Sequence, residues 1–441
     1  MTRREVKYAL AAALLASTSL GAMSAGASAA DLGGNCCADL EERIAELEAT
    51  TARKGNRKVS LAVSGWVAQQ IVFWDDGVEQ NAYIGGVGTT LASNVTFSGQ
   101  AQIAPGWNAG YVLQIEVNPN DPFFQSQSVP NGTFEPGLPS FGTGVHLLQS
   151  YWFIKSDKLG KVSIGQISPA SDNGAILPQD GSGTLFPANW VLFDPIRAFQ
   201  LRRNGAPIVN GASGATLTWG DIANCAQVAQ AGGGIGSDCT AAPGNFVRYD
   251  SPVFAGFSAS ASWGEDDFWD VALRYAGEFS GIKVSIGGAY SENKDENWIV
   301  PTPATRDVQY FQIGGYAEHV SSGLWAYAAY GHENIDSVQR VLGSDDHWYV
   351  KAGVKLSLFS IGQTIPYAEY GEHKDMLAIT VPDATGSEIH RWGIGFVQNI
   401  DAAAMSMWVA YRNIDGSIDG GTSAGDLDNY QFIKAGAVIN F

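Results

Sequence analysis

Two groups of charged side chains in this chain could act together on a dissolved ion. The first group lies in one long irregular segment, residues 168–244, and consists of Asp172, Asp180, Asp194, Arg197, Arg202 and Arg203. The second group consists of bases in regularly alternating segments: Arg248, Arg274, Lys283, Lys351, Lys355, Arg391, Arg412 and Lys434. Opposite charges that face one another across a narrow, water-filled space create a transverse field that selects solutes by size and charge. A simpler interpretation is a solvated lining in which the bases pair with acids such as Glu116 or Glu369.

Covalent chemistry has weak support, and we predict no catalytic residue, no metal site and no cofactor. The six histidines are scattered, without the His-Glu-x-x-His spacing of a zinc site. The glycine run at 232–236 follows no predicted strand and precedes no predicted helix, so it indicates a loop and not a phosphate-binding turn. The acidic pair Asp345-Asp346 could hold calcium, but a solvated loop tip is the favoured interpretation.

The elements that must position the charges are strands. From Lys58 onward, apolar residues recur at every second position, as in strands with one face in an apolar medium and one in a polar medium. The pattern predicts about sixteen of them: 58–73, 93–104, 109–118, 146–156, 161–168, 245–251, 254–263, 268–276, 282–291, 306–318, 324–332, 347–359, 364–372, 388–399, 405–413 and 428–441.

The connections between these segments alternate in length. Short turns such as 105–108 and 321–323 alternate with long loops such as 119–145 and 333–346. Transmembrane barrels of the outer membrane have short periplasmic turns and longer outer loops. We therefore predict an all-β fold, an antiparallel transmembrane β-barrel of about sixteen strands. Its aromatic girdles would include Trp74, Trp269, Tyr290, Trp348, Trp392 and Tyr411.

The alternation also predicts which side chains face the lumen. If Val271, Leu273 and Tyr275 face lipid, Arg274 between them faces inward. The same parity turns the other seven bases of the second group inward. A charge on the lipid face costs about 2–4 kcal/mol at mid-bilayer, which favours this orientation.

Both ends of the chain carry signals of export and assembly. Arg3, Arg4 and Lys7 precede an apolar run and a small-x-small cleavage site, so residues 1–29 are predicted to be a cleaved signal peptide. Residues 30–57 form a predicted periplasmic segment, in which 36–54 carries a two-heptad coiled-coil stripe. The barrel would span 58–441. Its last strand ends at Phe441, and closure requires that strand to pair with the first.

Composition and cysteines narrow the class of protein. The chain has 441 residues, 53 glycines, 16% charged residues and a net charge of −18. This acidic balance excludes a protein that binds nucleic-acid phosphates. Cys225 and Cys239 lie in a polar loop, and an oxidising exported compartment predicts a disulfide between them. The pairing of Cys36 and Cys37 stays open.

Several stretches resemble the porins of rhizobial alphaproteobacteria. They are residues 36–59, Phe73-Trp74-Asp75-Asp76-Gly77, Leu159 to Gln166, Arg248 to Pro252, and the C-terminal Phe441. The resemblance implies a homotrimer of sixteen-stranded barrels in the outer membrane of a Gram-negative cell, passing small hydrophilic solutes and ions by passive diffusion. It also implies that 168–244 is a constriction loop folded into the lumen. Gly165 is followed directly by Gln166, where many relatives carry an Arg between the two, so one wall charge is missing.

The resemblance further implies contacts with outer-membrane lipids and recognition of Phe441 by the barrel-assembly machinery. A cell-wall contact through the coiled coil is a further expectation. The alternatives are a substrate-specific outer-membrane channel, a barrel enzyme, or a cell-wall tether. Pore size, ion preference and physiological solute are left open by the sequence.

Overall fold

The computed structural model describes most of the predicted barrel. The described residues are 58–88, 90–132, 144–175, 181–182, 194–211, 214–223, 225, 239, 243–264, 267–295, 306–337, 342–378, 381 and 383–441. The predicted signal peptide, the coiled-coil segment with Cys36 and Cys37, and Asp180 lie outside these residues.

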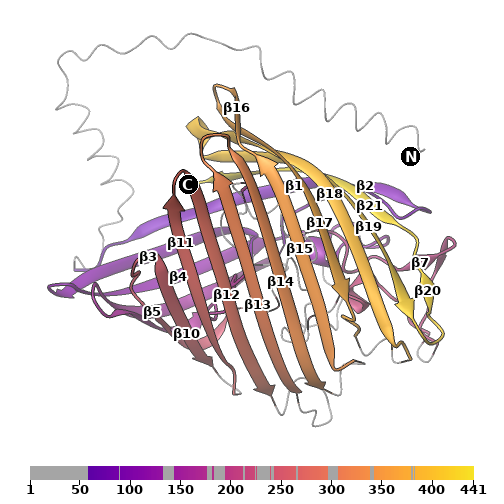
Figure 1. Cartoon of the computed structure of the whole chain (residues 1–441), viewed down its shortest axis with the longest axis horizontal. Helices are drawn as coiled ribbons and strands as arrows, with labels where there is room; N and C mark the ends of the chain where they lie inside the picture. The colour runs from indigo at the N-terminus through magenta and orange to yellow at the C-terminus, as the bar shows by residue number, and fades with distance from the viewer. Residues whose placement is uncertain are drawn as a thin grey trace.

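Within the described residues, sixteen long strands form one closed antiparallel sheet. They are β1 (Ala62–Asp75), β3 (Ser93–Ala104), β4 (Trp107–Asn118), β5 (Gly144–Ser156), β6 (Gly160–Ile167), β9 (Gly244–Asp250), β10 (Phe257–Gly264), β11 (Trp269–Phe279), β12 (Ile282–Asp295), β13 (Arg306–His319), β14 (Leu324–Ser337), β15 (Ser344–Val354), β17 (Gly362–Lys374), β18 (Gly386–Ile400), β19 (Met405–Asp419) and β21 (Tyr430–Asn440). The predicted sixteen-stranded barrel is thus confirmed (Figure 1).

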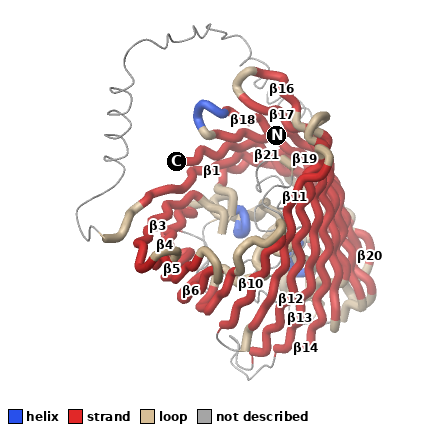
Figure 2. The backbone as a smooth tube through the Cα atoms, turned by 60° about the vertical axis from the view of Figure 1, so that its left-hand side comes forward, coloured by secondary structure: helices blue, strands red, loops and turns tan. Residues whose placement is uncertain are grey.

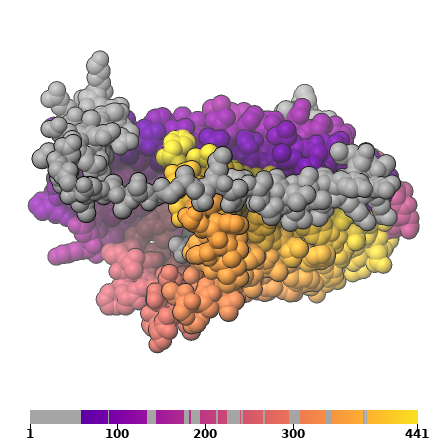
Figure 3. Space-filling view, turned by 90° about the horizontal axis from the view of Figure 1, so that it is seen from above, coloured from indigo at the N-terminus to yellow at the C-terminus, as the bar shows by residue number. Residues whose placement is uncertain are grey.

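Closure depends on the pairing of the first strand with the last. Trp66–Asp75 of β1 lie opposite Gln431–Asn440 of β21 in an unbroken antiparallel register. Beyond that register, the backbone of Phe441 exchanges two hydrogen bonds with Gly65, both 3.0 Å long. From above, the yellow end of the chain lies against the indigo first strands (Figure 3). No edge is left at this seam, which satisfies the backbone polar groups that lipid cannot.

Within the described residues, five short strands accompany the long ones; β16 falls inside the predicted segment 347–359, and the other four were not predicted. β2 (Gln80–Gly85) pairs with the second half of β1, β16 (Leu356–Phe359) extends β15, and β20 (Gly425–Asp426) pairs with β19. β7 (Arg202–Arg203) and β8 (Ala206–Pro207) form a separate hairpin. Three 3-10 turns complete the elements: η2 (Pro122–Phe124), η3 (Trp219–Asp221) and η4 (Asp401–Ala403). No described helix is long and apolar enough to cross a membrane.

Strand ends agree with the predictions to within three residues at the short turns, and several strands extend beyond the predictions at the long loops. β14 continues to Ser337 and β19 to Asp419, five and six residues past the predicted 332 and 413. In these extensions charged and polar residues such as Asp336 and Asp415 occupy outward positions. The apolar alternation therefore stops before the hydrogen-bonded ladder does.

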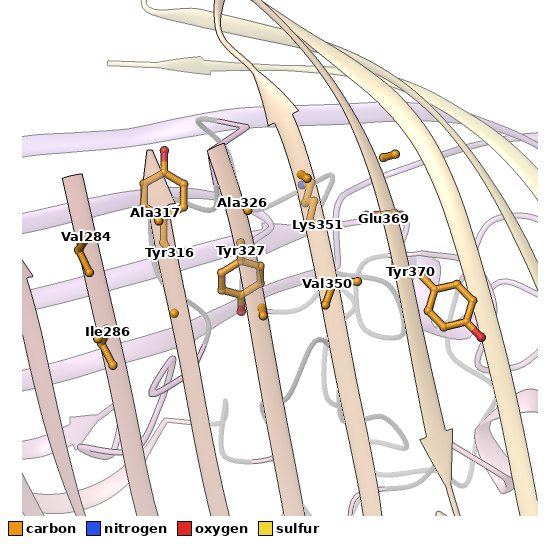
Figure 4. Close-up of a pocket in the computed structure, with 14 residues that line it drawn as sticks. Val284, Ile286, Tyr316, Ala317, Ala326, Tyr327, Val350, Lys351, Glu369 and Tyr370 are labelled. Carbon is orange, nitrogen blue, oxygen red and sulfur yellow. The ribbon is translucent and has the colours of Figure 1, made fainter. Parts of the chain in front are cut away.

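Side chains alternate between the two surfaces of the barrel wall. On β12, Ile286 is 46% exposed on the outer surface, whereas Ala289 is 6% exposed on the inner surface. Neighbouring outward residues of β12–β17 surround a shallow hollow of about 650 Å³, floored by alanines (Figure 4). Behind the same wall, Lys351 and Glu369 are buried on the lumen side, as their parity predicts.

The outer aromatic residues form the predicted girdle with one exception. Ring pairs join neighbouring strands along this belt: Trp269–Tyr290, Trp348–Tyr370 and Trp392–Tyr411, with centroids 5.3 to 5.5 Å apart. The assignment of Trp74 to the girdle was wrong. Its indole points inward and packs on Phe199, with ring centroids 4.9 Å apart.

A charge introduced on the outer face of β12 should destabilise the barrel more than a charge introduced on its inner face. Ile286→Lys places an ammonium in hydrocarbon and should lower the free energy of unfolding by about 2–4 kcal/mol. Ser285→Lys, one residue away, turns toward lumen water and should cost less than about 1 kcal/mol. Denaturant titration of the protein folded into lipid vesicles measures both. Equal losses for the two variants would contradict the assigned faces.

Candidate lumen site

The described parts of the inserted segment (residues 168–243) lie inside the barrel (Figure 2). Figure 2 shows loop segments and a helical turn within the ring of strands. Its contacts follow the inner wall in strand order: Ser171 reaches β11, Ala175 reaches β14, and Ser182 reaches Lys351 of β15. Asp194 then reaches β19 and β21, and Arg202 reaches the turn after β1. The segment therefore follows the wall around the lumen.

The start of the segment is held by two of the predicted wall bases. Arg274 donates to the carbonyls of Ala170 and Asp172, at 2.9 and 3.1 Å. Arg248 donates to the carbonyls of Ser168 and Pro169 and forms an ion pair of 2.8 Å with Asp250. These guanidiniums bind backbone oxygens, so they fix the path of the chain.

Hydrogen bonds from other strands complete this attachment. Ser171 donates through both its amide and its hydroxyl to Asp270, each at 2.6 Å. Gln312 accepts from the amide of Ala175, and the hydroxyl of Tyr327 donates to the Ala175 carbonyl. Gly314 allows this approach, because a Cβ there would lie 2.0 Å from that carbonyl oxygen.

Asp194 is the centre of a fully buried ionic cluster. It accepts from Arg412 and, at 2.6 Å, from Lys434. Arg412 also pairs with Glu369, and the hydroxyl of Tyr349 donates to that carboxylate at 2.6 Å. Two bases and two acids thus balance one another away from water, which is the condition under which buried charges are tolerated.

The middle of the segment forms an apolar core with the inner wall. Phe199, Leu201, Leu217, Trp219 and Ile222 pack against inward residues of β1, β18, β19 and β21: Val72, Trp74, Ile389, Ile414, Ile418, Tyr430 and Phe432. The hydroxyl of Tyr430 also donates to the Pro195 carbonyl at 2.5 Å. The described middle of the segment therefore packs directly on this part of the inner wall.

Three arginines follow Asp194, and each has a separate partner. Arg202 pairs with Asp76 at 2.7 Å and Glu79 at 2.6 Å. Arg203 donates to the carbonyls of Ser423, Gly425 and Asp426. The guanidinium of Arg197 lies 3.9 Å from the ring centroid of Phe123, and burial lowers the Arg197 pKa to about 10.

The pKa of Asp76 reflects its contacts in the turn after β1. Burial acts to raise it, but hydrogen bonds from Gln127, the Glu79 amide and Arg202 dominate, and the pKa falls below its ordinary 3.8. This carboxylate is consequently held in its charged form.

The predicted disulfide is present: Cys225 and Cys239 are bonded, with Cα atoms 5.5 Å apart. Both sulfurs are buried against Tyr310 of β13 and Met376. The bond therefore closes part of the inserted segment beside the inner wall.

Lys283 and Lys355 lie toward the short-turn end, whereas Arg391 lies nearer the long loops, on β18. Lys355 pairs with Glu318 at 2.7 Å, and Lys283 lies directly opposite Glu318 on the neighbouring strand. Arg391 lies over the Tyr349 ring, 4.5 Å from its centroid. All eight predicted bases thus have the inward parity expected from the sequence.

The described acids of the inserted segment do not face the wall bases across open water, contrary to what the sequence led us to expect. Asp194 touches its bases directly, and Asp172 lies beside Arg274, whose bond is to the Asp172 carbonyl. The reason is that the segment packs on the wall, which brings opposite charges into contact. The expectation of a solvated tip at Asp345-Asp346 was also wrong: both lie in β15, with Asp345 buried on the inner face.

Two arrangements of catalytic type do not form a nucleophilic site. Residues 421–425 match the Gly-x-Ser-x-Gly pattern, but they connect β19 to β20 and lack the strand-to-helix turn that exposes a nucleophile. Ser321 and Ser322 bond to the two ring nitrogens of His319 in an exposed turn. No nitrogen of this ring remains for an orienting carboxylate.

The fold and this lumen define an outer-membrane β-barrel. A profile of the Gram-negative porin family matches residues 11–433, so the chain belongs to that family. It is an outer-membrane channel for passive diffusion. No curated protein matches the sequence at a significant level.

Solved structures with a similar fold include an anion-selective porin from Comamonas acidovorans. It has a TM-score of 0.52 and 13% identity, and the match covers 87% of this chain and all of that one. A loop-deletion mutant of the outer-membrane protein OmpT of Vibrio cholerae matches with a TM-score of 0.50, 13% identity and the same coverage. At this identity the likeness concerns the fold.

The buried cluster predicts unequal effects of neutralising two loop acids. Asp194→Asn leaves Arg412 and Lys434 buried with one carboxylate fewer and should lower the free energy of unfolding by about 3–5 kcal/mol. Asp172→Asn, at a half-buried position, should cost less than about 1 kcal/mol. Denaturant titration in vesicles compares them. A loss for Asp172→Asn as large as that for Asp194→Asn would refute the anchoring role of Asp194.

The lowered pKa of Asp76 predicts acid-sensitive attachment of the segment. Because the folded-state pKa lies below the ordinary 3.8, the carboxylate stabilises the fold above that pH, and the stabilisation disappears as pH falls through the folded value. The stability gap between wild type and Asp76→Asn should therefore be full at pH 7 and shrink below about pH 4. Unfolding free energies at a series of pH values measure the gap. A gap that is constant down to pH 2 contradicts the assignment.

Proposed function

We propose that the protein is a homotrimeric general diffusion channel of the rhizobial type, in which the inserted segment narrows one side of the lumen. The observation that carries this proposal is the attachment of that segment to the inner wall from β9 around to β1. A barrel of sixteen strands is wide enough for a water-filled channel. Filling one side of it leaves a narrower path along the remaining wall.

Weak charge selection is the mode of sieving that the lumen contacts support. Five described inward bases pair with acids of the wall or the inserted segment: Arg412 and Lys434 with Asp194, Lys355 with Glu318, and Arg248 and Lys161 with Asp250. Paired charges produce a smaller field in the path of an ion than separated charges do. We therefore infer that size limits passage more than charge does. No covalent step is part of this mechanism.

The outer surface supports a trimer. On β12–β19, charged residues stand above the aromatic girdle at outward positions: Glu292, Lys294, Asp307, His332, Asp346, Glu372, Lys374, Glu388, His390 and Asp415. The described outward positions of β1 and β3–β6 carry only Asp75 among charged residues, and many are large and apolar. The charged outer surface of β12–β19 is suited to contact with lipid headgroups. The apolar outer surface of β1 and β3–β6 is suited to contact with neighbouring subunits.

Export and assembly complete the proposal. Residues 1–29 would be removed as a signal peptide, and the 36–54 stripe would lie in the periplasm, where it could contact the cell wall. Phe441 is 58% exposed at the end of β21, so its ring is accessible to an assembly factor.

Single-channel recording tests this function. Purified protein added to a planar bilayer should insert as units of three equal conductance steps. The permeability ratio of K⁺ to Cl⁻ should lie within a few-fold of one, because the lumen charges are paired. The absence of any conductance would refute the channel function. Single steps of unequal size would refute the trimer. Strong exclusion of either ion would contradict weak charge selection.

A further inference from the structure

Two histidines and a methionine form a buried cluster on the inner wall near the long loops. His347 of β15 and His373 of β17 lie directly opposite each other, with ring centroids 5.6 Å apart and planes at 11°. Met376 follows β17, and its sulfur lies 3.3 Å from Nδ1 of His373. The three residues are 1%, 2% and 0% exposed. The channel mechanism uses none of them.

One ring nitrogen of this cluster has no hydrogen-bond partner among the described residues. Nε2 of His347 bonds to the Tyr310 hydroxyl at 3.2 Å, whereas its Nδ1 is buried without a partner. An unsatisfied buried nitrogen is costly, and an absent ion is one of its recognised explanations. If Nε2–H donates to Tyr310, the Nδ1 lone pair is available to a metal, because the bond at one nitrogen selects the tautomer of the ring.

The donor types favour a soft metal. Imidazole nitrogen together with thioether sulfur suits monovalent copper and its analogue Ag⁺ better than magnesium, calcium or manganese. With the zinc bond lengths of about 2.0 Å to nitrogen and 2.3 Å to sulfur as a guide, one ion could span the 3.3 Å between Nδ1 of His373 and the sulfur at an angle of roughly 100°. For this, the Nδ1 proton of His373 must move to Nε2. Binding at this pair thus requires a change of tautomer.

Of the charged residues around the cluster, some favour the binding of a cation and one opposes it. Glu333 lies opposite Tyr310, and Asp345 lies opposite Glu333; both carboxylates are buried on the inner face and favour a cation. Arg391 opposes it, because its positive charge acts on both histidines. This balance favours a monovalent over a divalent ion. The neighbouring Cys225–Cys239 sulfurs are oxidised and supply no thiolate.

We propose that His347, His373 and Met376 form a binding site for a soft monovalent metal cation, Cu⁺ or Ag⁺, beneath the long-loop end of the barrel. The site is independent of the diffusion path, so binding does not rest on the proposed function. A bound ion would cross-link β15 to the chain that follows β17.

Silver titration of the purified protein in detergent tests the site. Cys36 and Cys37 are replaced by Ser in every sample, so that free thiols do not bind the probe. Calorimetry should show one Ag⁺ per chain. Met376→Leu and His373→Gln should each weaken binding by more than about tenfold. Met407→Leu, on the outer surface of β19, and His319→Gln, in an exposed turn, are matched controls and should bind as the parent does.

Unchanged Ag⁺ affinity in Met376→Leu would overturn the proposal, as would Zn²⁺ binding as tightly as Ag⁺. Should a variant not fold, X-ray absorption of the silver-loaded parent decides: nitrogen and sulfur donors support the site, and nitrogen and oxygen donors alone refute it. Normal conductance of the parent without metal, together with tight Ag⁺ binding, separates this outcome from that of the channel proposal.

Discussion

The structure depends on the hydrogen bonds that join β1 to β21. In hydrocarbon, every unpaired amide or carbonyl costs several kcal/mol, so a sheet can cross a membrane only when it has no edge. The ten-residue register between Trp66–Asp75 and Gln431–Asn440, continued by Gly65 and Phe441, removes both edges at once. Once closed, the wall has two surfaces in different media, and the period of two in the sequence follows from that division.

The same closure sets the electrostatics of the interior. Inward charges cannot escape to lipid, and many become buried when the inserted segment packs on the wall. In this chain, direct contacts compensate the buried charges: Asp194 pairs with Arg412 and Lys434, Asp76 pairs with Arg202, and backbone carbonyls accept from Arg248 and Arg274. The bases that would line an empty cylinder thus hold the inserted segment in position. The proposed sieving would depend on the same residues.

The sequence predicted those features that depend on local periodicity. The sixteen strands, the short turns and the inward parity of eight bases all follow from alternation between adjacent residues. The contacts of the inserted segment do not. Phe199 meeting Trp74, or Asp194 meeting Lys434, joins residues far apart in the chain without any repeating pattern. Trp74 was misassigned although the parity of Val67, Ile71 and Phe73 turns it inward, because an inward core inside a barrel has the same composition as an outward girdle. The sequence did not predict the cluster of His347, His373 and Met376 either, because the spacing of these residues matches no metal-binding motif.

The most direct test of the account is lipid quenching along β12. A fluorophore attached to single cysteines introduced at residues 284–289, in vesicles that contain brominated lipid, reports which side of the wall each position faces. The account predicts strong quenching at the even positions and weak quenching at the odd ones. Quenching that ignores this alternation would contradict a closed wall between hydrocarbon and water.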